Sequence, residues 1–147
     1  MKKTDVAIKY FEEGFACSQS VLVAFASDFN IPEKTALRLA SGFGGGMGER
    51  AETCGAITGA FCVIGLKYGQ TSSQDKAGKE VVYQKVREAA DKFKERNFGC
   101  ILCKSLLRCD ISTKAGKEEA IKNSYFKDLC PKFIKDAIEI TEELIGK

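Results

Sequence analysis

The stretch from Gly42 to Gly69, GFGGGMGERAETCGAITGAFCVIGLKYG, constrains this chain more than any other. Glycine occupies five of the seven positions 42–48. Because glycine loses much conformational entropy on folding, such a density predicts positive φ angles, a close backbone approach or a concavity of N–H groups. Cys54 follows, in the first turn of a helix predicted to run to about Lys67. Gly55 and Gly59 are four residues apart, so on that helix they share one face and allow a neighbour to come close. A shaped loop next to a thiol is the predicted functional centre.

The rest of the chain has helical patterns, without a period-two strand or an internal repeat. We therefore predict an all-α fold: one cysteine-rich domain over residues 1–147, built as a bundle of about six to eight helices with a glycine-rich loop. At 147 residues such a domain buries enough surface to fold without disulfides. The predicted helices cover residues 4–13, 17–29, 32–42, 54–67, 74–96, a short one over 100–109, 113–122, and one that begins at Cys130-Pro131.

Charge and apolar segments indicate which partners and which cell compartment to expect. The net charge is only +3, and no basic block with interleaved aromatic residues occurs, so a nucleic-acid partner is not expected. The N-terminus meets acidic residues before any apolar segment, unlike a signal peptide. The longest nearly uncharged apolar run, Ala56–Leu66, is too short to span a bilayer. These features predict a cytoplasmic protein without membrane insertion.

The chain has seven cysteines and no histidine. The lack of histidine excludes Cys-His hydrolases and histidine-ligated metal sites. In a reducing compartment, many cysteines indicate metal ligation or redox chemistry rather than a disulfide framework. Four of them are predicted near helix starts, where unpaired N–H groups lower a thiol pKa: Cys17, Cys54, Cys103 and Cys130. The alternative is that these cysteines are small core residues.

The other motifs are less informative. Cys100 and Cys103 form a CxxC, but no strand precedes it as in thioredoxin-like folds, and no second CxxC completes a zinc site. Cys62 lies inside AFCVIGL and is predicted to be a core residue. The glycine loop lacks the GK[ST] ending of a phosphate-binding loop and fits no GxGxxG register.

Several segments together resemble the family named for its C_GCAxxG_C_C pattern, which is classed as redox-active: FACSQSVLVAF, SGFGGGMGERAETCGAITGAF, ILCKSLLRCDIST and LCPKFIKDAIEITEEL. The resemblance covers residues from about 5 to 145. By this resemblance, residues 54–59 are the family's CGAxxG motif, Cys17 is the cysteine before the loop, and Cys103 and Cys130 are the two after it. The motif here reads Cys-Gly-Ala, whereas the family label reads Gly-Cys-Ala. Some relatives in this family have selenocysteine at a cysteine position, and the resemblance therefore implies a redox role for the cysteines of this chain.

Three hypotheses follow. In the first, Cys54 is the attacking thiolate of a thiol redox protein, and one of Cys17, Cys103 or Cys130 resolves it as a reversible disulfide. This chemistry needs no cofactor, and its partner is a redox protein or a small-molecule oxidant or reductant. In the second, the same four cysteines bind Zn²⁺ or an iron–sulfur cluster in a non-enzymatic metal-binding or electron-transfer protein. In the third, the apolar Cys54 helix packs against a partner protein.

Overall fold

The computed structural model of the protein describes residues 1–146 and is mostly helical. Within these residues it contains no β-strand, only an isolated bridge between Thr53 and Leu102. The labelled helices are α1 (Lys3–Glu12), α2 (Cys17–Ala26), α3 (Glu33–Ala40), α4 (Gly44–Met47), α5 (Gly55–Tyr68), α6 (Lys76–Arg96), α7 (Cys103–Leu107), α8 (Lys114–Lys122) and α9 (Tyr125–Ile145). Short 3₁₀ turns cover Ser27–Phe29 and Ser41–Phe43.

The segment labelled α4 is not a right-handed helix. Gly45 and Gly46 inside it have φ values of +65° and +73°. Without α4, residues 1–146 contain eight α-helices. The all-α class, the helix number and the glycine-rich loop predicted from the sequence are confirmed, and the extent of a single domain over 1–147 stays a prediction.

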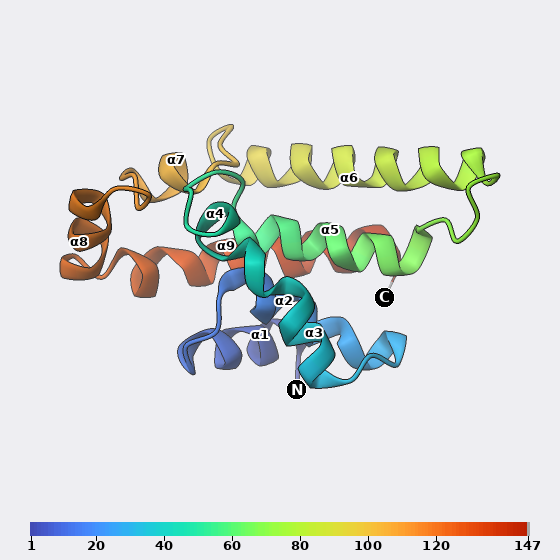
Figure 1. Ribbon diagram of the computed structural model, residues 1–147, viewed down its shortest axis with the longest axis horizontal. Coiled ribbons are helices and arrows are strands. Elements are labelled where there is room, and N and C mark those ends of the chain that lie inside the picture. The colour runs from blue at the N-terminus through green and yellow to red at the C-terminus, as the bar shows by residue number, and fades with distance from the viewer. Residues whose placement is uncertain (147) are drawn as a thin grey trace.

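The long helices α5, α6 and α9 lie side by side, and α2 packs against α5 from the opposite side with α1 and α3 around it (Figure 1). Helix α5 is apolar nearly all round, which is typical of a helix that is enclosed on several sides. It contacts α2, α6 and α9. Most of its apolar surface is therefore used inside the protein, and nothing in the structure calls for the third hypothesis. The largest fully buried side chains include Phe25, Phe93, Leu22, Ile57, Ile64, Ile134, Ile138 and Ile140.

Two glycines let α2 reach α5. A Cβ at Gly59 would lie 2.8 Å from the Ser18 carbonyl oxygen, and one at Gly55 would lie 3.2 Å from the Ser18 backbone nitrogen. Ser18 is fully buried, and its hydroxyl donates a hydrogen bond to the Ala40 carbonyl at 2.7 Å. The glycines of the CGAxxG motif thus hold the first turn of α2 against the first turns of α5.

Most predicted helix ends are close to the observed ones. Thr113, at the predicted start of the helix over 113–122, caps α8 by accepting a hydrogen bond from the Gly116 backbone N–H at 2.9 Å. The cap of α6 is Asp75, whose carboxylate accepts from Gly78 N–H at 2.9 Å.

Two predicted helices differ from the structure. Helix α9 begins at Tyr125, so the prediction that a helix begins at Cys130-Pro131 is wrong. Proline favours a helix start, but Tyr125, Phe126 and Leu129 pack against the core and extend the helix backward. The short helix over 100–109 is also reduced to Cys103–Leu107. Arg108 takes a left-handed conformation with φ +57° and ends it.

Within the described residues, no helix combines the length and the apolar character needed to cross a membrane.

The helix contact predicts opposite effects for two alanine substitutions on α5. Gly59→Ala should lower the free energy of unfolding by roughly 1–3 kcal/mol, because the new methyl group collides with backbone atoms of α2. Gly65→Ala is the matched control on the same helix: a Cβ there meets nothing within 4 Å. It should raise stability by about 0.5–1 kcal/mol through helix propensity. Urea denaturation measures both, and equal effects of the two substitutions would refute this account of the contact.

Candidate functional site

The glycine-rich loop forms a left-handed turn. Residues 45–49, Gly-Gly-Met-Gly-Glu, all have positive φ, between +63° and +73°, and Ala51 follows at +59°. The turn is closed by backbone hydrogen bonds from Glu49 N–H to Gly44 (3.0 Å), Ala51 N–H to Gly45 (3.0 Å) and Glu52 N–H to Gly46 (2.9 Å). A non-glycine residue in this conformation costs roughly 1–2 kcal/mol. The predicted need for positive φ is confirmed, and the loop carries strain at Met47, Glu49 and Ala51.

The turn lies directly against the chain near Cys103. A Cβ at Gly46 would lie 2.6 Å from the Glu52 nitrogen and 2.8 Å from the Cys103 Cβ. Only glycine leaves room for this approach. The left-handed turn therefore packs its backbone onto one of the four candidate cysteines.

A short antiparallel pairing then places two of the cysteines side by side. Cys103 N–H donates to the Glu52 carbonyl at 2.6 Å, and Cys54 N–H donates to the Ile101 carbonyl at 2.9 Å, around the bridge between Thr53 and Leu102. Because side chains alternate along extended backbone, Cys54 and Cys103 lie on the same side of this pairing.

Helix α2 brings a third cysteine to the same place. The Cys17 Cβ would lie 3.5 Å from a Cβ at Gly55, the residue next to Cys54. The approach of α2 that Gly55 and Gly59 permit therefore seats Cys17 beside Cys54. Cys130 reaches the group from the second turn of α9.

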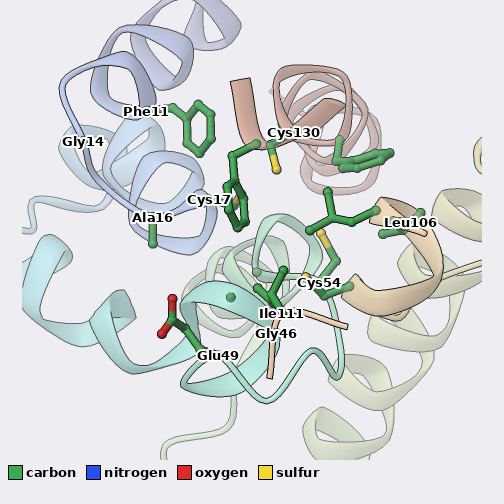
Figure 2. Close-up of a pocket in the computed structure, with 16 residues that line it drawn as sticks. Phe11, Gly14, Ala16, Cys17, Gly46, Glu49, Cys54, Leu106, Ile111 and Cys130 are labelled. Carbon is green, nitrogen blue, oxygen red and sulfur yellow. The ribbon is translucent and has the colours of Figure 1, made fainter. Parts of the chain in front are cut away.

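All four predicted cysteines line one cavity of about 280 Å³ (Figure 2). The four cysteines that the sequence singles out, Cys17, Cys54, Cys103 and Cys130, thus lie around one space, and their roles as redox or metal-binding residues stay a prediction. Three of the four sit at helix starts as predicted: Cys17 and Cys103 are the first residues of α2 and α7, and Cys54 is the N-cap of α5. Cys130 is inside α9, so the helix-start prediction is wrong for it.

The remaining wall of the cavity is mostly apolar. Glu49 supplies the one carboxylate among the described lining residues, and it is exposed and paired with Lys117 at 2.8 Å. No lysine or arginine from residues 1–146 lines the cavity. Its apolar walls come from residues that sequence spacing could not assign to the site, because they lie on separate segments: Phe11, Leu106, Leu107, Ile111, Phe126 and Phe133.

Burial dominates the ionisation of the thiols. It raises the pKa of Cys54 to about 12, and the neighbouring Cys17 adds to this, while the backbone N–H groups of Ala56 and Ile57 act in the opposite direction. Burial likewise raises the pKa of Cys103 to about 12, with further contributions from Cys54 and Cys17. Hydrogen bonding to Cys130, and then burial, raise the pKa of Cys17.

The expectation that Cys54 is a low-pKa thiolate is therefore wrong for this structure, in which Cys54 is buried. The helix N-terminus does direct N–H groups at Cys54, as expected, but desolvation of the charged form outweighs them. The raised pKa values keep the thiols of Cys17, Cys54 and Cys103 neutral at ordinary pH. All seven cysteines are free.

The arrangement does not form a site for one metal ion. Among residues 1–146, no three cysteine, aspartate, glutamate or histidine side chains are placed to bind a single ion. Sulfurs that share one Zn²⁺ can be no more than about 4.6 Å apart, since each Zn–S bond is about 2.3 Å. The geometry thus gives no support to the zinc alternative at Cys17, Cys54, Cys103 and Cys130.

The other three cysteines lie elsewhere. Cys62 is half-buried on α5 and burial raises its pKa, in line with the predicted packing role. Cys109 is half-buried, with its thiol directed at the Gly116 carbonyl at 3.6 Å. Cys100 precedes α7 and lines a second cavity.

A comparison with known protein families matches residues 15–144 to the family described as "Putative redox-active protein (C_GCAxxG_C_C)", a range that contains all seven cysteines. No curated protein and no solved structure matches the chain.

The raised pKa of Cys54 predicts a loss of stability in alkali. The thiol ionises near pH 8.5 in an unfolded chain but only near 12 in the folded protein. Between these values the folded state binds more protons, so the stabilisation is complete below pH 8.5 and falls as the pH rises toward 12. In denaturant titrations with reductant between about pH 8.5 and 10.5, wild type should lose up to about 1.4 kcal/mol per pH unit more than Cys54→Ala. Parallel pH profiles for the two proteins would show that Cys54 is not desolvated.

Proposed function

The chain belongs to the C_GCAxxG_C_C family, and we propose that it is a small thiol redox protein that forms a reversible disulfide inside the four-cysteine cavity. The observation that carries the proposal is that cysteines from four separate segments line one cavity. A cluster of buried core cysteines without a role has no reason to converge from α2, α5, α7 and α9 on a strained loop.

Cys54 is the proposed attacking residue, and Cys17 the proposed resolving residue. Cys17 interacts with all three of the other cavity cysteines: it interacts with Cys130, and its charge would affect both Cys54 and Cys103. It also lies beside Gly55, the residue next to Cys54. A disulfide requires the two Cα atoms to lie within roughly 7 Å of each other. The close contact of α2 with α5 brings Cys17 near Cys54, so this pair is the one that we expect to meet the requirement.

The reaction proceeds by thiol–disulfide exchange. The Cys54 thiolate attacks one sulfur of a partner disulfide, forms a mixed disulfide, and releases the other partner sulfur as a thiolate, which takes up a proton. Cys17 then attacks the Cys54 sulfur and releases the second partner thiol. The protein is oxidised by two electrons and the partner disulfide is reduced to two thiols. The partner is a redox protein or a small-molecule disulfide, and the predicted setting is the cytoplasm.

The cavity also determines when this exchange occurs. A protonated thiol is a poor nucleophile, so the closed structure keeps Cys54 inactive. Gly45, Gly46 and Glu49 of the left-handed turn line the cavity. Displacement of that turn would admit water and remove the desolvation, and the N–H groups of Ala56 and Ile57 would then stabilise the thiolate.

A count of free thiols tests the proposal. In a buffer of reduced and oxidised dithiothreitol, wild type should lose two of its seven thiols reversibly as the ratio is made more oxidising. Cys54→Ser should lose this transition while its far-UV circular dichroism stays near wild type, since serine also caps a helix well.

Cys62→Ser is the matched control, because Cys62 is on the same helix α5 but outside the cavity. It should keep the two-thiol transition. A wild-type protein that keeps all seven thiols over the whole range contradicts the thiol redox function. A Cys54→Ser protein that oxidises like wild type contradicts the role of Cys54 as the attacking residue.

The same cavity supports an iron–sulfur cluster as a second candidate. Four cysteines with no competing histidine are the usual ligand set of such clusters. A cluster with several irons holds its ligand sulfurs farther apart than a single Zn²⁺ does, so the missing single-ion geometry does not count against it. Cys17, Cys54, Cys103 and Cys130 would hold the cluster, which would supply one-electron transfer.

Visible absorption separates the two candidates. Protein purified without oxygen should be colourless and free of iron and acid-labile sulfide if the thiols themselves exchange electrons. A brown protein that loses its colour in Cys54→Ser but keeps it in Cys62→Ser favours the cluster and rules out the free-thiol mechanism.

A further inference from the structure

A second cavity lies on the other side of α7 from the four-cysteine site. We name it the outer groove; it has a volume of about 450 Å³. Leu106, Leu107 and Phe133 line both cavities, so a layer of single side chains separates them. The volume is in the usual range for small-molecule sites. The outer groove is lined by Asn97, Phe98, Cys100, Ser105, Leu106, Leu107, Arg108, Tyr125, Leu129, Lys132 and Phe133.

The local backbone directs the two thiols of the CxxC to opposite cavities. The chain just before α7 pairs with residues 52–54 in an extended conformation. Cys103 takes part in this pairing, whereas Cys100 lies before it, in a turn where its N–H donates to the Asn97 carbonyl at 2.9 Å. Cys103 accordingly lines the inner cavity and Cys100 the outer groove, where Cys100 is half-buried with its sulfur 3.8 Å from the Phe98 carbonyl oxygen.

The outer groove has positive charge and no carboxylate among its described lining residues. Lys132 is already occupied: its ammonium donates to Asp136 at 2.7 Å and to Asn97 Oδ1 at 2.9 Å. Arg108 is different, because it is exposed and takes part in none of the ion pairs found within residues 1–146. Its planar guanidinium can bind a ligand carboxylate through two parallel hydrogen bonds.

We infer that the outer groove binds small carboxylate-bearing disulfides, of the glutathione type, and that Cys100 exchanges with them. The carboxylate pairs with Arg108, and the ligand's aliphatic part lies on the aromatic and leucine side chains of the groove. The Cys100 thiolate attacks one ligand sulfur, the ligand S–S bond breaks, and the other half leaves as a thiolate that takes up a proton. Cys100 is oxidised to a mixed disulfide and one ligand half is reduced to a thiol. This exchange does not depend on a disulfide in the four-cysteine cavity.

Cys109 provides an internal control with opposite electrostatics. It is half-buried like Cys100, but Asp110 and Glu119 lie close enough to raise its pKa further after burial. Its surroundings repel an anionic disulfide and attract a cationic one. The two cysteines therefore separate the effect of the groove from that of mere accessibility.

The experiment uses the reduced full-length protein, briefly exposed to a disulfide, quenched with acid and mapped by peptide mass spectrometry. Oxidised glutathione should modify Cys100 faster than Cys109, and the cationic disulfide cystamine should shift the preference toward Cys109. Arg108→Gln should slow the reaction of Cys100 with oxidised glutathione roughly two- to fivefold, the size expected for one exposed ion pair. Its reaction with the neutral hydroxyethyl disulfide should be unchanged.

Two results would overturn the inference. One is a rate at Cys109 that equals or exceeds that at Cys100 with oxidised glutathione. The other is an Arg108→Gln protein that reacts more slowly with the neutral and the anionic disulfide alike, since that shows a structural rather than an electrostatic role. Cys54→Ser separates this inference from the proposed function: it should remove the inner disulfide and leave the modification of Cys100 intact.

Discussion

The left-handed turn of residues 45–49 is the constraint on which the rest of the site depends. Five consecutive residues with positive φ occur here because three of them are glycines, and because Gly46 has no Cβ to separate the turn from Glu52 and Cys103. The turn leads into the backbone pairing of residues 52–54 with 101–103, which places Cys54 and Cys103 on the same side of that pairing. Gly55 and Gly59 then admit α2 and place Cys17 beside them. The motif glycines are thus needed for the positions of the cysteines, not for chemistry of their own.

Burial and the α5 helix terminus oppose each other at Cys54. The N–H groups of Ala56 and Ile57 favour a thiolate, and the apolar walls disfavour it and raise its pKa to about 12. Under the proposed function, Cys54 is unreactive while its thiol is desolvated and becomes reactive when water enters the cavity, because hydration removes the desolvation and leaves the N–H groups in place. Met47, Glu49 and Ala51 are strained, and they lie in the turn whose displacement would open the cavity. This strain raises the free energy of the turn in its present position and so lowers the free energy needed to displace it.

The sequence was sufficient for the all-α class, because periodic apolar residues are a local signal. The four cysteines that it singles out by predicted helix starts do line one cavity, although Cys130 is inside α9 rather than at its start. The sequence was insufficient for the ionisation of Cys54, since helix starts are visible in a sequence but desolvation depends on walls such as Phe11, Phe126 and Phe133 from distant segments. The start of α9 was missed because packing of Tyr125 and Phe126 overrides the signal of Pro131. The division of Cys100 and Cys103 between two cavities depends on an extended pairing with residues 52–54 that no local pattern indicates.

The central claim is that the four cysteines form one redox site, and the structure of the fully oxidised protein tests it most directly. Crystals grown from oxidised protein should show a disulfide between two of Cys17, Cys54, Cys103 and Cys130, with the Cys17–Cys54 pair expected first. Residues 45–49 should differ from their position in the reduced protein. Four separate thiols in that cavity, with oxidation confined to Cys62, Cys100 or Cys109, would contradict the account.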